Sequence, residues 1–219
     1  MADTFIWGRK GSGKTLRACI DLWLDWLTGN QIWANTWLHP AFDYNPVTKQ
    51  KGNLHIIDGV DLIRMLVESK DEPLSDDNQN KTLLLDEIKT QASARGFSSI
   101  INRHMVDFVS QARKRNFKII YTDQILGAYD RWLRLMTDNI ISCQPFVNKN
   151  DLGLSTNPEY PEPLYFRYYN LDLTQDNEIE PHITSFEISR KTSRMFYGLY
   201  KTGYMITPLE LKYGEDISV

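Results

Sequence analysis

The sequence feature that most limits the possible folds of this chain is a short apolar strand that leads directly into a glycine-rich loop. Residues 5–15 read Phe-Ile-Trp-Gly-Arg-Lys-Gly-Ser-Gly-Lys-Thr, which contains the spacing Gly8-x-x-x-x-Gly13-Lys14-Thr15 of the phosphate-binding P-loop, or Walker A motif. Glycines in such a loop let backbone N–H groups turn inward toward phosphate oxygens. A helix that begins near Lys14 directs the positive end of its dipole at the same anion. The motif therefore predicts nucleotide binding at the end of a strand.

The polar residues of the loop have separate predicted roles. Lys14 is expected to reach the β- and γ-phosphates of ATP, and the Thr15 hydroxyl to bind Mg²⁺. The nucleotide is expected to contact the whole loop, namely Gly8, Arg9, Lys10, Gly11, Ser12, Gly13, Lys14, Thr15 and Leu16.

A second apolar strand ends in two acids, Asp86 and Glu87, after Thr-Leu-Leu-Leu. A run of this kind is typical of a parallel strand that is buried on both faces. Asp86 is predicted to hold Mg²⁺ in the Walker B role, and Glu87 to polarise the attacking water as a general base. A solvated acidic turn is the structural alternative, which the upstream P-loop disfavours. The pair therefore favours hydrolysis of ATP.

A third strand, over residues 118–122, leads to Gln124. In many P-loop motors the strand beside the Walker B strand ends in a polar residue that senses the γ-phosphate or the attacking water. We predict this role for Gln124. The structural alternative is a polar residue that only caps the strand.

The length, net charge and cysteine content limit the classes of protein to which this chain can belong. The chain has 219 residues, enough for one α/β domain with a small appendage, and a net charge of −3. Any contact with nucleic acid must therefore come from a local basic patch. The two cysteines, Cys19 and Cys143, lie in predicted elements and form neither a disulfide framework nor a zinc motif. No apolar run approaches about 18 residues, so no transmembrane segment is expected.

The order of elements predicts the fold. Strands and helices alternate up to about residue 143, which indicates a mostly parallel sheet with helices on both faces, an α/β RecA-like P-loop NTPase core. The first helix is predicted over about 14–28 from the helical spacing of its apolar residues, which are Leu16, Ile20, Trp23, Leu24 and Leu27.

The last third of the chain changes character. Three further strands, without intervening helices, are predicted over 164–173, 183–189 and 195–200. We therefore expect an ATPase core over 1–147 and a β-rich extension over 148–219, packed on the core in one compact domain.

Walker A, the acid pair and Gln124 together resemble the additional-strand, catalytic-glutamate ATPases. The segments 111–115, 119–124 and 130–138 resemble the FtsK–HerA superfamily. The chain looks closest to the small genome-packaging ATPases of tailless double-stranded DNA viruses, especially those that infect archaea. It is also similar to the nucleotide-binding part of zonula-occludens-toxin-like phage assembly proteins. Residues 198–202 resemble a short motif common to both groups.

This resemblance implies a homo-oligomeric ring, a hexamer or a pentamer, with ATP at the subunit interfaces. An arginine of one subunit then stabilises charge on the phosphoryl group in its neighbour's site. Arg134 matches the family's arginine best, and Arg131 is the second candidate. The structural alternative is that both are surface arginines paired with Asp130 or Asp138.

Double-stranded DNA is the implied track. Residues 95–118 are strongly basic, and Asp107 is the one acid among them. On the inner surface of a ring they would meet DNA phosphates without reading bases. The candidates are Arg95, Arg103, Arg113, Lys114 and Arg115; the alternative is a solvated basic helix face.

The leading functional hypothesis is an ATP-driven translocase that packages a viral genome. Such a motor would work in the host cytoplasm or at the packaging vertex of the virion, and its docking partner would be a capsid, vertex or membrane protein. A phage assembly or extrusion ATPase is the first alternative, although that group generally carries a membrane anchor. A P-loop small-molecule kinase and a nucleotide-gated adaptor without turnover are the others.

Overall fold

The structure is a computed structural model of the chain and describes residues 2–57, 80–87, 107–110, 112, 114, 116–124, 136–146, 163–173 and 179–205. Its helices and strands are β1 (Thr4–Trp7), α1 (Lys14–Leu27), β2 (Gln31–Ala34), β3 (Thr36–Leu38), the 3₁₀ helix η1 (Pro40–Asp43), β4 (Leu54–Ile56), β5 (Lys81–Leu85), β6 (Phe117–Asp123), β7 (Asn139–Phe146), β8 (Tyr165–Leu173), β9 (Ile179–Ser189), α6 (Arg190–Phe196), the 3₁₀ helix η5 (Tyr197–Leu199) and β10 (Tyr200–Met205).

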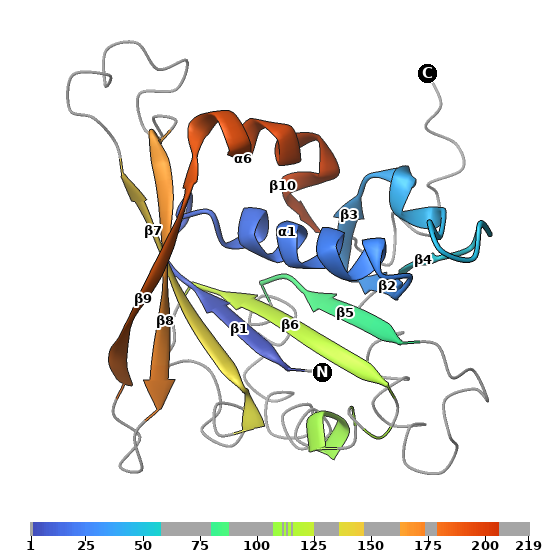
Figure 1. Cartoon of the computed structure of the whole chain (residues 1–219), viewed down its shortest axis with the longest axis horizontal. Coiled ribbons are helices and arrows are strands. Elements are labelled where there is room, and N and C mark those ends of the chain that lie inside the picture. The colour runs from blue at the N-terminus through green and yellow to red at the C-terminus, as the bar shows by residue number, and fades with distance from the viewer. Residues whose placement is uncertain are drawn as a thin grey trace.

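One twisted sheet of eight strands forms the centre of the molecule, in the order β4-β2-β5-β6-β1-β7-β8-β9 (Figure 1). The six strands β4, β2, β5, β6, β1 and β7 are parallel to one another. Strand β8 pairs antiparallel with β7, and β9 pairs antiparallel with β8. Strand β6 lies between the P-loop strand β1 and the Walker B strand β5. This mostly parallel sheet with flanking helices confirms the predicted P-loop NTPase fold.

The central strands are buried on both faces because their side chains alternate between two apolar clusters. On β1, Phe5 packs into one cluster and Ile6 into the other, and both are fully buried. Helix α1 covers the second face with Ala18, Cys19, Leu22 and Trp26 among others. Helical residues that include Phe108 and Val109 cover the first face.

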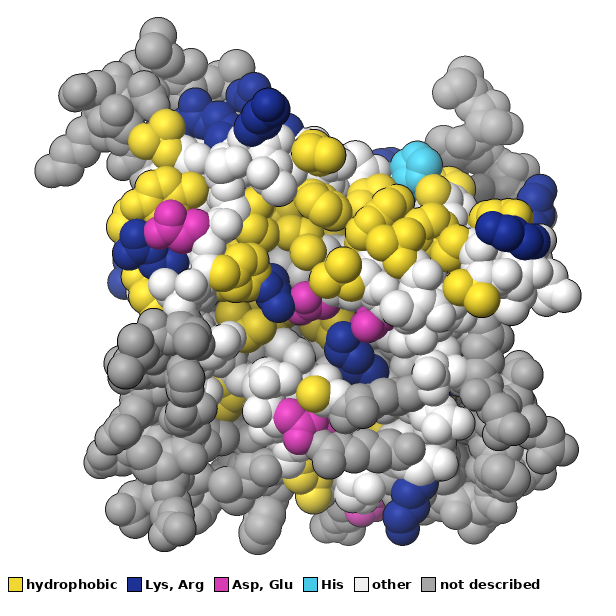
Figure 2. Space-filling model, in the orientation of Figure 1, with side chains coloured by type: hydrophobic (Ala, Val, Ile, Leu, Met, Phe, Trp, Pro, Cys, Tyr) yellow, Lys and Arg dark blue, Asp and Glu magenta, His cyan; other side chains and the backbone are white. Residues whose placement is uncertain are grey.

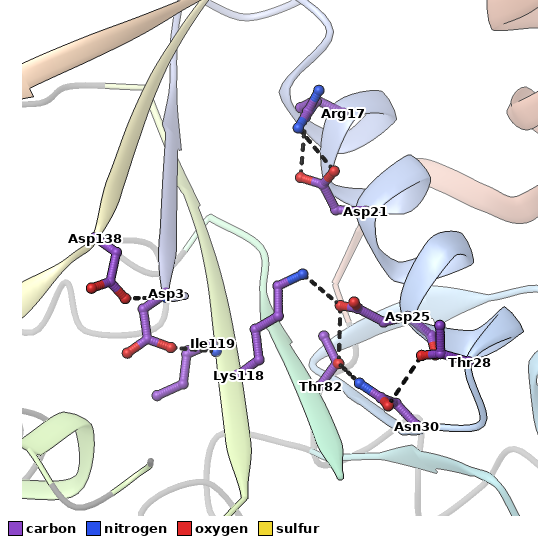
Figure 3. A network of polar contacts seen from close by, with 10 residues as sticks. All are labelled: Asp3, Arg17, Asp21, Asp25, Thr28, Asn30, Thr82, Lys118, Ile119 and Asp138. Atoms are coloured by element: carbon purple, nitrogen blue, oxygen red, sulfur yellow. Dashed lines mark hydrogen bonds and ion pairs between the residues drawn. The ribbon is translucent and has the colours of Figure 1, made fainter. Parts of the chain in front are cut away.

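The polar residues at the amino ends of the central strands are tied together (Figure 3). The Asp3 carboxylate accepts a hydrogen bond from the Ile119 N–H at 2.8 Å, and the Asp138 carboxylate accepts one from the Asp3 N–H at 2.7 Å. These bonds link β1, β6 and the residue before β7 at the end opposite the P-loop. They fix the relative register of the strands whose other ends carry the site.

The C-terminal region differs from its prediction in one respect. The predicted strand over 195–200 is wrong, because α6 and η5 occupy residues 190–199 and the strand β10 begins at Tyr200. The Ser189 side chain caps α6 by accepting the Thr192 N–H at 3.3 Å. Strand β10 pairs with β3 in a separate two-stranded sheet. The boundary between residues 147 and 148 stays a prediction.

Candidate functional site

The loop between β1 and α1 has the backbone conformation that its glycines predict. Gly13 is the N-cap of α1 with φ of 91°, in the left-handed region. A Cβ atom added to Gly13 would lie 2.5 Å from Cδ1 of Phe166 on β8. A Cβ atom on Gly8 would lie 2.8 Å from the carbonyl oxygen of Cys143 on β7. Both positions therefore require glycine, because the neighbouring strands press directly on the loop.

The interior of the loop is polar and suited to an anion. Lys14 is buried, and its ammonium group donates to the Arg9 carbonyl at 3.2 Å. Burial lowers the pKa of Lys14, while the nearby charges of Glu87 and Asp86 oppose the shift. The Ser12 hydroxyl is buried and has no hydrogen-bond partner among the described residues. A phosphate group would supply both the negative charge and the missing acceptor.

Asp86 follows β5 and lies beside the P-loop. The Thr15 hydroxyl donates to its carboxylate at 3.3 Å, and the Thr122 hydroxyl of β6 donates to the same oxygen. The side-chain amide of Asn35, which follows β2, forms hydrogen bonds with both backbone polar groups of Asp86. It accepts the Asp86 N–H at 2.7 Å and donates to the Asp86 carbonyl at 3.0 Å. Burial raises the pKa of Asp86, and the hydrogen bonds from Thr122 and Thr15 oppose the rise.

Glu87 lies just after the Walker B strand β5 and has a φ of 47°, an uncommon value for a residue with a side chain. Its N–H donates to the Thr122 hydroxyl at 3.0 Å. Its carboxylate accepts from the Gln124 side chain at 3.3 Å. The structure therefore brings the two acids, the P-loop and Gln124 together at the carboxyl ends of three neighbouring strands.

Thr122 and Asn35 were not among the predicted site residues. Both are polar residues at a strand end, which is the signal that identified Gln124, and both are buried. The sheet register places Leu85 of β5 opposite Tyr121 of β6 and so brings Asp86 beside Thr122.

The arrangement of oxygen atoms suits a magnesium ion. Thr15 and Asp86 lie within 3.3 Å of each other and offer a hydroxyl and a carboxylate. Within the described ranges, no group of three or more His, Cys, Asp or Glu residues could hold a metal ion. Mg²⁺ prefers hard oxygen ligands and is usually bound by one or two protein groups, with phosphates and water completing its shell. The residues present fit an ion of this kind.

Most of the predicted arginine sites lie outside the described residues: Arg95, Arg103, Arg113, Arg115, Arg131 and Arg134. Lys114 is described and exposed. The basic stretch from which the DNA contacts were inferred extends to Lys118, but the Lys118 ammonium pairs with Asp25 of α1 at 2.7 Å (Figure 3). Lys118 therefore ties β6 to α1, and its charge is paired with that of Asp25.

None of the helices in the described part of the chain combines the length and the apolar character that a bilayer span requires.

The chain is similar in sequence to a phage protein and in structure to solved proteins. No family model matches the chain. The Gene 1 protein of Enterobacteria phage f1 is 27% identical over 147 residues, which is 66% of this chain and 42% of that protein. The chain thus spans less than half the length of this relative.

Among solved structures, the chain is similar to the genome packaging NTPase B204 from Sulfolobus turreted icosahedral virus 2. In the complex of that protein with AMPPCP the TM-score is 0.41 at 12% identity, with 83% of this chain and 96% of the other covered. In its complex with ATP-gammaS the TM-score is 0.43 at 13% identity, with the same coverage of both chains.

Proposed function

We propose that this protein binds and hydrolyses ATP, with Glu87 as the general base. One observation carries the proposal: Glu87 follows Asp86 directly, and its backbone and carboxylate are held separately by Thr122 and Gln124. A carboxylate fixed in this way, beside a buried phosphate-binding lysine, is positioned to take a proton from water near the γ-phosphate. A kinase would not need a base for water at this place.

The other residues of the site divide the remaining tasks. Lys14 and the backbone N–H groups of the P-loop bind the β- and γ-phosphates and stabilise the charge that develops on them. Thr15 and Asp86 would hold Mg²⁺, which neutralises phosphate charge when bound. Gln124 orients the Glu87 carboxylate through its amide. Arg134, or Arg131, supplied by a neighbouring subunit, would complete the site.

Beyond hydrolysis, the proposed work is translocation of double-stranded DNA for packaging of a viral genome. The Walker motifs, Gln124 and the FtsK–HerA-like segments support this, and they imply a ring of five or six copies around the duplex. The ring would act in the host cytoplasm or at the packaging vertex, docked on a capsid, vertex or membrane protein. Lys114 is exposed, as a contact with DNA phosphates requires.

A phage assembly or extrusion ATPase is the second candidate. The sequence similarity to the Gene 1 protein of Enterobacteria phage f1 supports a phage protein of this kind. In this case the ATPase would drive a membrane-bound assembly machine, and duplex DNA would not control its turnover.

Steady-state phosphate release distinguishes the two candidates. It would be measured at saturating ATP and Mg²⁺ with linear double-stranded DNA, with single-stranded DNA, and without nucleic acid. The packaging proposal predicts stimulation by the duplex and loss of activity in Arg134→Ala or, where Arg131 is the trans arginine, in Arg131→Ala. DNA affinity would also be measured at several salt concentrations. The proposal predicts that Lys114→Ala lowers the slope of log K against log salt concentration (the salt slope) by about one, whereas Lys191→Ala on α6 leaves this slope unchanged. Turnover that ignores duplex DNA would contradict packaging and support the assembly function.

A further inference from the structure

Strand β8 forms one wall of the P-loop and β9 contacts the start of α1, although the sequence placed both strands in a β-rich extension packed on the core. We propose that Tyr168 of β8 is a positioning residue for nucleotide binding, which orients the peptide between Gly13 and Lys14 toward the phosphates. The inference rests on the proposed ATP site and adds to it a residue outside every recognised motif.

Two side chains on the same face of β8 contact the N-cap of α1. The Tyr168 hydroxyl donates to the Gly13 carbonyl at 3.2 Å, and Tyr168 is fully buried. Two residues earlier, the Phe166 ring lies so close to Gly13 that an added Cβ atom would be 2.5 Å from it. Gly13 is therefore fixed by one hydrogen bond and one van der Waals contact from the same strand.

The planarity of the peptide bond links this contact to the phosphates. The Gly13 carbonyl and the Lys14 N–H belong to one peptide unit, whose oxygen and hydrogen point in opposite directions when it is trans. The structure contains no cis peptide among its described residues. A hydroxyl that holds the carbonyl on the side of β8 therefore holds the Lys14 N–H on the opposite side. Backbone N–H groups of the P-loop are the donors that bind phosphate.

Strand β9 reinforces the wall through Arg17, one turn into α1. The Arg17 N–H donates to the same Gly13 carbonyl at 3.0 Å. Its guanidinium lies 4.3 Å from the centre of the Phe186 ring on β9 and pairs with Asp21 at 2.9 Å. Phe186 is the cross-strand partner of Tyr168. The start of α1 is thus held by a hydrogen bond within the helix and by contacts with side chains of β8 and β9.

This arrangement couples the outer strands to the nucleotide. If β8 and β9 stabilise the phosphate-binding conformation of the loop, a bound nucleotide must stabilise β8 and β9 by the same free energy.

The test uses Tyr168→Phe, which keeps the ring and removes the hydroxyl. The matched control is Tyr169→Phe, which removes the neighbouring hydroxyl, to which Arg167 donates at 3.2 Å. The equilibrium Kd for AMPPNP with Mg²⁺ would be measured by calorimetry for both variants and the wild type. We expect Kd to rise in Tyr168→Phe by up to about five- to tenfold, the value reached when the hydrogen bond stabilises only the phosphate-binding conformation of the loop. We expect Kd to stay unchanged in Tyr169→Phe.

A second measurement separates positioning from general stability. Hydrogen exchange at the backbone amides of residues 165–171 should slow when AMPPNP binds to the wild type, and this protection should weaken in Tyr168→Phe. Unchanged Kd in Tyr168→Phe beside normal wild-type binding would overturn the inference, as would an equal loss in Tyr169→Phe. Absence of binding by the wild type would overturn the proposed function itself, and this inference with it.

Discussion

The Thr122 hydroxyl connects the two Walker B acids, so removing it should cost both stability and turnover. Thr122 is fully buried on β6. Its hydroxyl donates to the Asp86 carboxylate and accepts the Glu87 N–H at 3.0 Å. The variant Thr122→Val replaces the hydroxyl by a methyl group of similar size. It therefore removes both bonds and leaves the packing of the strand nearly unchanged.

The magnitude follows from the two partners. A bond to a charged group contributes about 1.5–3 kcal/mol and a bond to a backbone N–H about 1 kcal/mol, so we expect Thr122→Val to lower the free energy of unfolding by about 3 kcal/mol. In a protein of this size the corresponding fall in Tm is roughly 6–12 °C. Loss of the support for Glu87 should lower kcat more than it raises KM for ATP.

Urea unfolding and steady-state phosphate release measure the two effects. Thr122→Ser retains the hydroxyl and is the control, which we expect to keep most of the wild-type kcat. If Thr122→Val were as stable and as active as Thr122→Ser, the hydroxyl would have no role in holding the acids, and the description of the site would be wrong.

Three other variants test separate contacts. Burial raises the pKa of Asp86, so the native protein loses stability as pH rises above 3.8, the ordinary pKa of this group. Asp86→Asn should therefore be more stable than the wild type at pH 7. In urea titrations it should also lose less stability than the wild type between pH 4 and 7. Gly13→Ala should cost at least about 1–2 kcal/mol of stability for its left-handed backbone and weaken AMPPNP binding more than tenfold, as measured by calorimetry. Lys118→Met should cost about 1–2 kcal/mol in urea unfolding, since it leaves the half-buried Asp25 without its cation. It should not alter the salt dependence of DNA binding, and an altered dependence would show that Lys118 contacts DNA despite this pair.

The sequence was sufficient to predict the core of the fold because the P-loop motif includes its own context. The strand before Gly8 and the helix after Gly13 are both part of the pattern. The apolar runs of β5 and β6 identified two more central strands, and polar residues at their ends located the site. These patterns are local in the sequence, so they can be recognised without knowledge of the tertiary structure.

Features that depend on contacts between distant segments were less predictable. Spacing identified α1 as a helix but not which side faces the sheet: Leu24 is 56% exposed and Leu27 48% exposed, although both belong to the apolar pattern. In Figure 2 hydrophobic side chains form a band across the face that α1 occupies in Figure 1. Lys118 ends the basic stretch over 95–118, but only the fold reveals that its ammonium group pairs with Asp25 of α1.

The C-terminal region shows the same limit. The aromatic run that begins at Met195 has the composition of a strand, but the Ser189 cap and the polar residues after it begin a helix instead. Nothing in the local pattern of β8 indicated that Tyr168 reaches Gly13, because 155 residues separate the two in sequence.

The most direct test of the central claim compares binding and hydrolysis in Glu87→Gln. The amide keeps the size of the side chain but cannot take a proton from water. Our account predicts that Glu87→Gln binds ATP and Mg²⁺ with wild-type affinity, while single-turnover release of phosphate falls by about 10²-fold or more. Hydrolysis by Glu87→Gln at the wild-type rate would contradict the assignment of Glu87 as the general base and, with it, the proposed mechanism.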